Sequence, residues 1–209
     1  PLRRQRQMCI RDSFQPDDRL RIRDLAEQLG TSVTPVRDAI LQLAKEKALI
    51  LKTPRDIRVP VLTREQYAEI RSIRLALEGL AAETAAGKVT AEQLQMLERN
   101  IRDNLEAVHC GDLIAALKLN QAFHFALADI AGMPLLRDML DSLWMRTGPL
   151  IARAYGDFSE RMAVEHHWEV LRALEKGDGT AARQAICTDI LDGNQKMMEL
   201  IARREATLA

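Results

Sequence analysis

Apolar residues near the start of the chain recur with helical spacing over two adjacent stretches. Between them lies Gly30, and glycine readily adopts the left-handed backbone conformation in which many helices end. Ser32 or Thr34 can cap the second helix, and Pro35 is tolerated in a first helical turn. Two short helices around a glycine-containing turn predict a helix-turn-helix. The periodic apolar positions are Ile22, Leu25, Ala26 and Leu29, then Val36, Ala39, Ile40, Leu43 and Ala44.

A short apolar run and an alternating segment follow this helix pair. Residues 49–52 are mostly apolar, residues 53–56 contain turn-forming residues, and residues 57–61 alternate between apolar and polar. They predict a β-hairpin, and a helix-turn-helix followed by a hairpin is a winged helix, whose second helix enters the major groove of DNA. Its groove-facing residues should be polar or cationic and close to the helix start. Thr31, Ser32, Thr34 and Arg37 meet this condition.

From residue 64 onward the pattern is helical throughout. Thr90 and Gln93 have the spacing of a capping box, and few aromatic residues with no strand-like alternation favour an all-α antiparallel helical bundle. We therefore predict a mainly α protein, with a winged helix-turn-helix and small β-hairpin in residues 1–63 and the bundle in residues 64–209. The predicted bundle helices span residues 64–87, 90–109, 112–131, 133–155, 158–176 and 178–205.

Composition limits the class of protein. Of the 209 residues, 47% are hydrophobic and 29% are charged, a balance typical of soluble globular proteins. No apolar run approaches the roughly 18 residues of a membrane span, and the N-terminus has no signal-peptide layout, so we expect a cytoplasmic protein with no membrane partner. The three cysteines are odd in number and far apart, which favours reduced thiols over a disulfide framework or a zinc cluster. They are Cys9, Cys110 and Cys187.

The net charge of zero conceals an asymmetry along the chain. Residues 1–63 hold thirteen Lys and Arg against eight Asp and Glu, a net charge of +5, so the remainder carries −5. A basic first part and an acidic second part suggest different partners for the two. On charge alone, a chance distribution of solvated side chains explains the asymmetry equally well.

The residues of the helix pair carry a resemblance to a known family. The run LRIRDLAEQLGTSVTPVRDAILQLAKEKALI, residues 20–50, resembles the DNA-binding domain of GntR-type bacterial transcription regulators. Upstream, residues 10–20 are similar to the family's I-x-x-G-x-x-x-P-G-x-x-L lead-in, with Ser13 and Asp17 in place of its glycines. Residues 64–205 resemble the all-helical FCD effector domain of the family's FadR branch.

This resemblance implies that Arg23 and Arg37 contact phosphates or guanine, and that Ser32 and Thr34 hydrogen-bond near the helix start. The alternative for Arg37 is a surface ion pair with Asp38 or Glu46. The chain departs from the family in two places: Val33 stands where arginine is usual, and Asp56 stands where the wing usually has glycine. Operator choice should therefore differ from the family norm.

The resemblance also implies a metal site, because in many FCD domains one Asp and three His bind a divalent ion inside the bundle. Here those positions hold Asn120, His124, His167 and Asp189, with His167 selected over His166 by the register from Gly177-Asp178. Two His and one Asp suffice for Zn²⁺ or Mn²⁺, and Ni²⁺ is a further candidate, while Asn120 would offer only a neutral carbonyl oxygen.

The alternative is a metal-free polar pocket in which His124 and Asp189 hydrogen-bond each other. His109 and His166 are expected to face solvent.

Two arginines are candidates for holding an effector carboxylate in bidentate fashion. Arg74 lies in a segment that resembles the R-x-x-L-E start of the effector domain, and Arg146 follows Leu143-Trp144 on a helix expected to line the pocket. The alternative for Arg74 is a structural salt bridge with Glu78, one helical turn away.

Together these features predict a homodimeric regulator that binds double-stranded operator DNA and responds to a small organic acid, with repression favoured over activation. A metalloenzyme that uses His124, His167 and Asp189 is the alternative, but the sequence offers no partnered nucleophile and this reading leaves the basic domain without a role. A protein-interaction bundle explains neither the arginines nor the histidines. We therefore expect no enzymatic activity.

Overall fold

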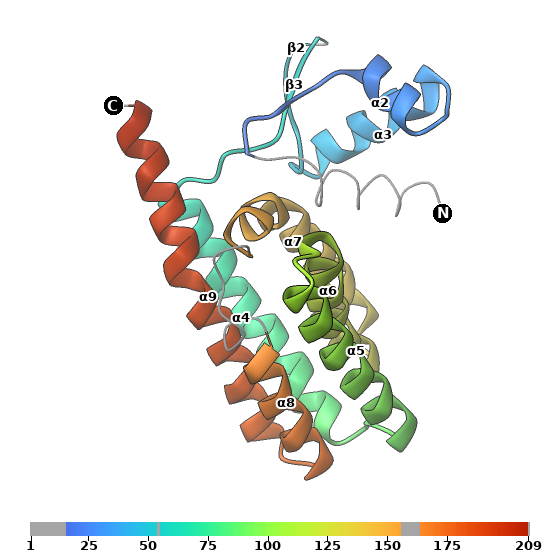
Figure 1. Ribbon diagram of the computed structural model, residues 1–209, viewed down its shortest axis with the longest axis vertical. Helices are drawn as coiled ribbons and strands as arrows, with labels where there is room; N and C mark the ends of the chain where they lie inside the picture. Colours follow the sequence, from blue (N-terminus) through green and yellow to red (C-terminus); the bar gives the residue numbers. More distant parts are fainter. Residues whose placement is uncertain (1–15, 54, 156–163, 209) are drawn as a thin grey trace.

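The computed structural model describes residues 16–53, 55–155 and 164–208. A small domain with a three-stranded sheet sits on one end of a larger helical bundle (Figure 1). The predicted mainly α architecture, a winged helix-turn-helix followed by an all-helical domain, is confirmed. The predicted helix start at residue 158, the lead-in residues 10–15 and Cys9 lie outside the described residues.

The small domain has the predicted helix pair and hairpin. Helix α2 (Ile22–Gln28) ends before Gly30, whose φ of +58° is the left-handed conformation that the sequence predicted. Helix α3 (Val33–Lys45) has Ser32 as its N-cap residue and Pro35 in its first turn, although the Ser32 side chain makes no capping hydrogen bond. Strands β2 (Ile50–Thr53) and β3 (Asp56–Arg58) form the hairpin.

A third strand, β1 (Arg19–Leu20), was not predicted. It pairs antiparallel with β3, so that the strand order is β1-β3-β2, with Leu20 opposite Ile57. Two residues are too few to show alternation, and the partner strand lies far along the sequence, which explains why the pattern gave no sign of it. Leu20 and Ile57 are buried in the core of the small domain.

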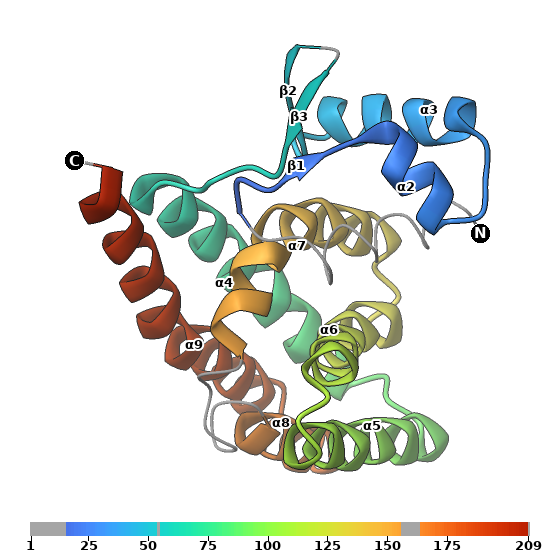
Figure 2. The same cartoon turned by 45° about the horizontal axis from the view of Figure 1, so that its top comes forward.

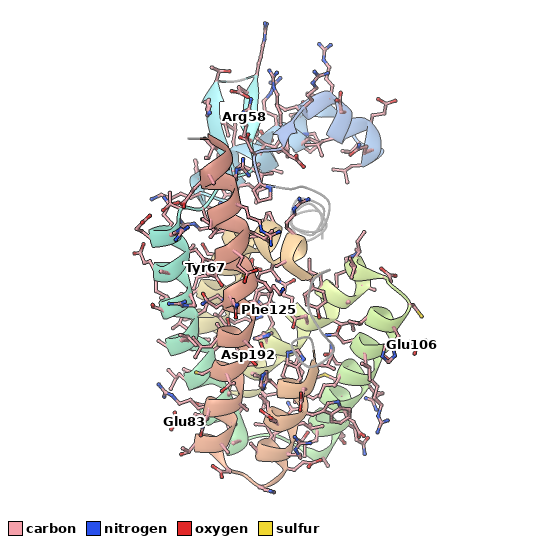
Figure 3. All side chains as sticks on the ribbon, turned by 60° about the vertical axis from the view of Figure 1, so that its left-hand side comes forward. Arg58, Tyr67, Glu83, Glu106, Phe125 and Asp192 are labelled. Carbon is pink, nitrogen blue, oxygen red and sulfur yellow. The ribbon has the colours of Figure 1, made fainter. Side chains whose placement is uncertain are left out.

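The bundle consists of long helices whose apolar faces enclose one core. Thr63 and Thr90 each cap a helix through a reciprocal hydrogen-bonded box, with Gln66 and Gln93 respectively; only the second was predicted. Figure 3 shows Tyr67 and Glu83 near opposite ends of α4. The helices are α4 (Arg64–Ala86), α5 (Ala91–His109), α6 (Leu113–Ile130), α7 (Pro134–Tyr155), α8 (His166–Glu175) and α9 (Gly179–Leu208).

Helices α4 and α9 lie side by side along most of their length (Figure 1). Gly79 permits this contact, because a Cβ there would lie 3.1 Å from the Cys187 sulfur and 3.2 Å from the side chain of Arg183. The close approach brings the middle of α4, where Glu78 lies, against the part of α9 that carries Asp189. Cys110 and Cys187 are free thiols, as predicted.

Helix α7 lies directly beneath the small domain and also forms part of the bundle (Figure 2). Trp144 belongs to the bundle core, whereas the next residue, Met145, belongs to the core of the small domain together with Leu20, Val36 and Ile57. One helix thus connects the two cores. Within the described residues, no helix is both long and apolar enough to span a membrane.

Candidate functional site

An arginine-lined hollow lies on the small domain where the starts of α2 and α3 meet the sheet. Its volume is about 770 Å³, and Asp24 is the one acidic residue among the described residues that line it. Two of the predicted DNA-binding residues, Arg23 and Arg37, line it. Strand β1, the residue after it and the hairpin turn supply three more arginines that sequence reasoning did not select. The arginines are Arg19, Arg21, Arg23, Arg37 and Arg55.

The predicted DNA-binding residues occupy the exposed edge of this domain, apart from one. Ser32, Thr34 and Arg37 are exposed at or near the start of α3, and Thr31 is half-buried in the turn. Neither Asp38 nor Glu46 pairs with Arg37, so the alternative of a surface ion pair is not formed among the described residues. The guanidinium is therefore available to a ligand.

The departure at the wing turn has a local explanation. The Asp56 carboxylate lies 3.0 Å from Arg58 Nε and 3.6 Å from Arg19 Nε, so its negative charge is offset within the domain. The adjacent carboxylate also raises the pKa of Arg58. Arg19 further donates a hydrogen bond to the Arg55 carbonyl, which ties β1 to the hairpin turn. Val33 lines the arginine-lined hollow and packs against the domain core.

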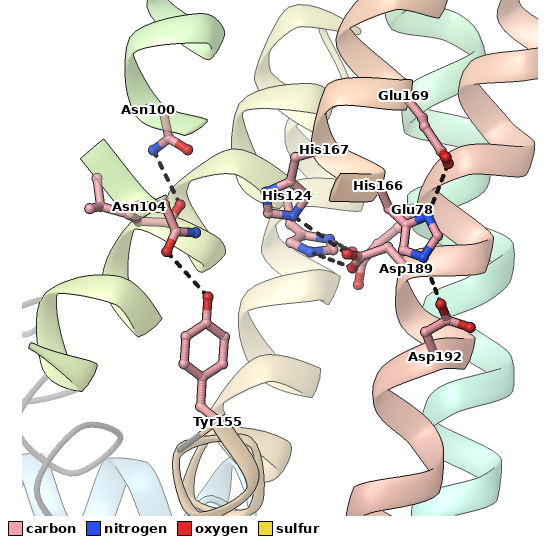
Figure 4. Close-up of polar contacts among 11 residues, drawn as sticks. Glu78, Asn100, Asn104, His124, Tyr155, His166, His167, Glu169, Asp189 and Asp192 are labelled. Carbon is pink, nitrogen blue, oxygen red and sulfur yellow. Dashed lines mark hydrogen bonds and ion pairs between the residues drawn. The ribbon is translucent and has the colours of Figure 1, made fainter. Parts of the chain in front are cut away.

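A second candidate site, the buried histidine cluster, lies inside the bundle (Figure 4). His124 on α6 occupies its centre. His124 Nδ1 lies 2.5 Å from Glu78 Oε2 on α4, and His124 Nε2 lies 3.2 Å from Asp189 Oδ2 on α9. His167 Nε2 on α8 lies 3.7 Å from Asp189 Oδ1. The two groups predicted to contact each other in the metal-free pocket, His124 and Asp189, therefore lie within ion-pair distance.

Glu78 also binds two cationic or polar groups besides His124. Arg74 Nε donates to Glu78 Oε1 at 2.6 Å, and Trp144 Nε1 donates to the same oxygen at 3.2 Å. The Arg74 guanidinium carbon lies 4.3 Å from the centre of the Trp144 ring, as in a cation–π contact. Arg74 thus forms the structural salt bridge with Glu78 that was the alternative to a role in effector binding.

Electrostatics in the buried histidine cluster follow from these contacts. Burial alone would raise the pKa of Glu78, but Arg74 and His124 outweigh it and lower the value to about 2. Burial would lower the pKa of His124, but Glu78 and Asp189 raise it to about 9. Two carboxylates therefore face the two cations Arg74 and His124, and the buried charges balance.

His167 has a different environment. It is fully buried, both of its ring nitrogens lack a hydrogen-bond partner within the described residues, and burial lowers its pKa to about 4. Its ring stacks on Phe123 with 4.0 Å between centroids, which holds it in place. A buried neutral imidazole without a hydrogen-bond partner is unusual, because unsatisfied buried polar groups are costly.

These residues fit a divalent metal. One ligand atom each from His124, His167 and Asp189 lies within 4.8 Å of the others, so small side-chain rotations would bring three donors to one ion. Glu78 on the far nitrogen of His124 is the kind of carboxylate that orients a metal-binding imidazole. Asn120 is buried one turn before His124 on α6, and its part as a ligand stays a prediction.

The expectation that His166 faces solvent was wrong, because this residue is only 2% exposed. Its Nδ1 lies 2.9 Å from Glu169 and its Nε2 lies 2.7 Å from Asp192 (Figure 4), and these carboxylates raise its pKa although burial opposes them. Helix α8 packs against α5 on one side and α9 on another, so two consecutive histidines are both covered. His109 is exposed, as expected.

The structure separates the two arginines proposed for the effector. Arg74 lies beside the buried histidine cluster, whereas Arg146 lines a different cavity, which contains none of His124, His167 or Asp189. Sequence reasoning also missed Trp144, and it assigned Glu78 only to a salt bridge. An acidic residue at a core-facing position of α4, among small apolar residues, was the available signal for Glu78.

Comparisons with known proteins agree with this architecture. The family model described as "Bacterial regulatory proteins, gntR family" matches residues 4–59, and the one described as "FCD domain" matches residues 69–192. The chain is 32% identical over 177 residues to the HTH-type transcriptional regulator McbR of Escherichia coli K12, covering 83% of this chain and 80% of McbR.

Two further matches agree. The HTH-type transcriptional repressor RspR of the same organism is 24% identical over 186 residues, which is 88% of this chain and 82% of RspR. The solved structure of E. coli McbR/YncC superposes with a TM-score of 0.86 at 28% identity and covers 95% of this chain and 96% of that chain. The relatives are named as transcriptional regulators.

The ion network predicts a large stability difference between two variants of α4. Glu78→Gln leaves the two buried cations Arg74 and His124 with one carboxylate, Asp189, so that one buried charge is no longer balanced, and we expect the free energy of unfolding to fall by about 3–5 kcal/mol. Glu83→Gln, on the same helix, removes an exposed carboxylate paired with Arg183 and should change little. Urea denaturation followed by circular dichroism measures both. Equal effects of the two variants would contradict the charge balance described above.

Proposed function

The chain belongs to the GntR family of bacterial transcription regulators and carries an FCD domain, and from this premise we propose that it is a homodimeric repressor whose hold on operator DNA is changed by a small carboxylate bound in the bundle. The observation that carries the DNA-binding part is the arginine-lined hollow beside the start of α3. The name of RspR, a transcriptional repressor, supports repression.

Helix α3 is the element proposed to enter the major groove. Arg37 lies in its second turn, where a guanidinium can bind guanine O6 and N7 together, and Ser32 and Thr34 at its start can bind phosphate or base edges. The arginines around the hollow, which include Arg23, would contact the backbone on either side. Phosphate contacts set affinity and position, while Arg37 would contribute to sequence choice.

We propose a homodimer because one winged domain contacts too little DNA for selective binding. One recognition helix and one wing read only a short stretch of DNA, and paired domains related by two-fold symmetry read two half-sites. The dimer remains part of the proposal.

The buried histidine cluster is the proposed effector site. His124, His167 and Asp189 would hold Zn²⁺, Mn²⁺ or Ni²⁺, with Asn120 as a weaker fourth donor. A bound ion would offer open coordination positions to the oxygens of a small organic acid. The two unpartnered nitrogens of His167 are the strongest support, because a metal would satisfy one of them.

Helix α7 offers a route from this site to the DNA-binding domain. Trp144 contacts Glu78 and lies 5.2 Å from the His124 ring between centroids, while Met145 is buried in the core of the winged domain. A ligand that changes the contacts of His124 or Glu78 would shift Trp144. That shift would change the position of the winged domain relative to the bundle. Such a differential contact is what an allosteric ligand requires.

A metalloenzyme would use the same three side chains, His124, His167 and Asp189. It would leave the arginine-lined hollow and the winged domain without a role, so the regulator accounts for more of the molecule.

For the DNA site, we expect Arg37→Ala to weaken operator binding by about 1–3 kcal/mol without loss of fold. Lys45→Ala removes a cation from the last turn of the same helix, outside the arginine-lined hollow, and is the matched control. Fluorescence anisotropy with an operator selected from random DNA measures both at moderate salt. Equal affinities of the two variants would remove Arg37 from the interface.

For the metal site, protein purified without chelator or metal-affinity column should contain a divalent metal by elemental analysis. His167→Ala and Asp189→Asn should lower the metal content and the rise in melting temperature on adding Zn²⁺, whereas His109→Ala, at an exposed position, should not. The double variant Asn120→Asp, Asp189→His, which restores the usual FCD ligands, should bind metal more tightly. Absence of metal together with no thermal response of the wild type would identify the cluster as a metal-free pocket.

A further inference from the structure

A cavity of about 620 Å³ lies between the winged domain and the bundle, apart from the buried histidine cluster. Its walls come from both domains: Pro16 and the linker residues 60–63 on one side, and the C-terminal parts of α7 and α9 on the other. Figure 1 shows the linker running from the hairpin past the end of α9 to the start of α4. Its volume is in the range of small-molecule sites, about 300–1,000 Å³.

The lining of this interdomain cavity is strongly cationic. Among the described residues it holds four arginines against one acidic residue, Glu205, and that carboxylate is already engaged by Arg64 at 2.9 Å. Arg204 pairs with Asp17 and donates to the Pro16 carbonyl, which fixes one wall in place. The four arginines are Arg146, Arg153, Arg203 and Arg204.

Arg146 is distinct within this set. Among residues 16–53, 55–155 and 164–208, none forms an ion pair or a hydrogen bond with its half-buried side chain. A guanidinium in a cavity that pairs with no carboxylate of the described residues is suited to bind an oxyanion in bidentate fashion. It extends from α7 one residue after Met145, the side chain that joins the winged-domain core.

The remaining lining is largely apolar, so a ligand that fills the cavity also needs an apolar body. These residues offer no charge to a polar ligand but would contact a hydrocarbon or aromatic body. They include Leu62, Pro149, Leu150, Leu200 and Ile201.

We propose that the interdomain cavity is a second ligand site, which binds a small carboxylate with an apolar body and holds the carboxylate on Arg146. Because the cavity walls belong to both domains, the occupant favours the arrangement in which the linker rests against α7 and α9. This site needs neither the metal nor His167, so its ligand can bind without the one proposed for the bundle. Both reach the winged domain through α7.

Equilibrium dialysis of the full chain against naphthalene-2-carboxylate, with its uncharged amide as the comparison, tests this site. The wild type should bind the carboxylate in the micromolar to millimolar range and the amide at least tenfold more weakly. Arg146→Gln should lower carboxylate affinity about tenfold to a hundredfold, as expected for loss of a charged hydrogen-bond partner. Arg99→Gln, which removes an exposed arginine on α5, should leave it unchanged.

Two more variants locate the ligand. Leu200→Trp, which fills the cavity from α9, should reduce binding, whereas His167→Ala should not. The proposal is overturned if the wild type does not bind, if the amide binds as well as the carboxylate, or if Arg146→Gln and Arg99→Gln behave alike. It is also overturned if His167→Ala abolishes binding, because the probe would then occupy the bundle. None of these outcomes bears on DNA binding by Arg37.

Discussion

Two consecutive residues of α7 are buried in different hydrophobic cores, and the arrangement of the molecule depends on this. Successive side chains on an α-helix point about 100° apart, so a helix can place neighbours in two cores only if it lies between them. Trp144 faces the bundle and Met145 faces the winged domain. Figure 2 shows α7 in this intermediate position. The position of the DNA-binding domain on the bundle therefore depends on the same helix that closes one side of the buried histidine cluster.

That cluster constrains the bundle through charge as well as packing. Glu78 receives hydrogen bonds from Arg74 and Trp144 and contacts His124, which in turn contacts Asp189. Removal of any one charged member would leave one buried charge without compensation, which is far more costly than loss of a surface ion pair. A metal held by Asp189 and His167 would compete with the existing contact between Asp189 and His124. A change in the contacts of His124 would then alter the position of Glu78, which accepts a hydrogen bond from Trp144.

The sequence predicted those features that depend on local pattern. Helical spacing and Gly30 were enough for the helix-turn-helix, and the spacing of Thr90 and Gln93 was enough for a capping box. Strand β1, however, exists only because it pairs with β3, which lies about forty residues later by register, Arg19 with Arg58.

In the candidate sites too, residues placed by local pattern were predicted, whereas residues placed by tertiary contacts were not. Arg23 and Arg37 were predicted, but Arg19 and Arg55 join them only when the sheet forms. The burial of His166 depends on α9, which supplies Asp192. The position of Arg146, in a cavity apart from the histidines, depends on how two domains meet, and no periodicity within one helix carries that information.

Hydrogen–deuterium exchange of Trp144→Phe measures most directly whether α7 couples the two domains. The substitution removes the hydrogen bond to Glu78 and part of a buried ring without touching the winged domain. Trp168→Phe, the same change on α8, is the matched control. We predict faster exchange in Trp144→Phe both in the bundle and at the amides of the β1–β3 ladder, and in the bundle alone for Trp168→Phe. Exchange in Trp144→Phe that is faster only in the bundle would contradict the coupling.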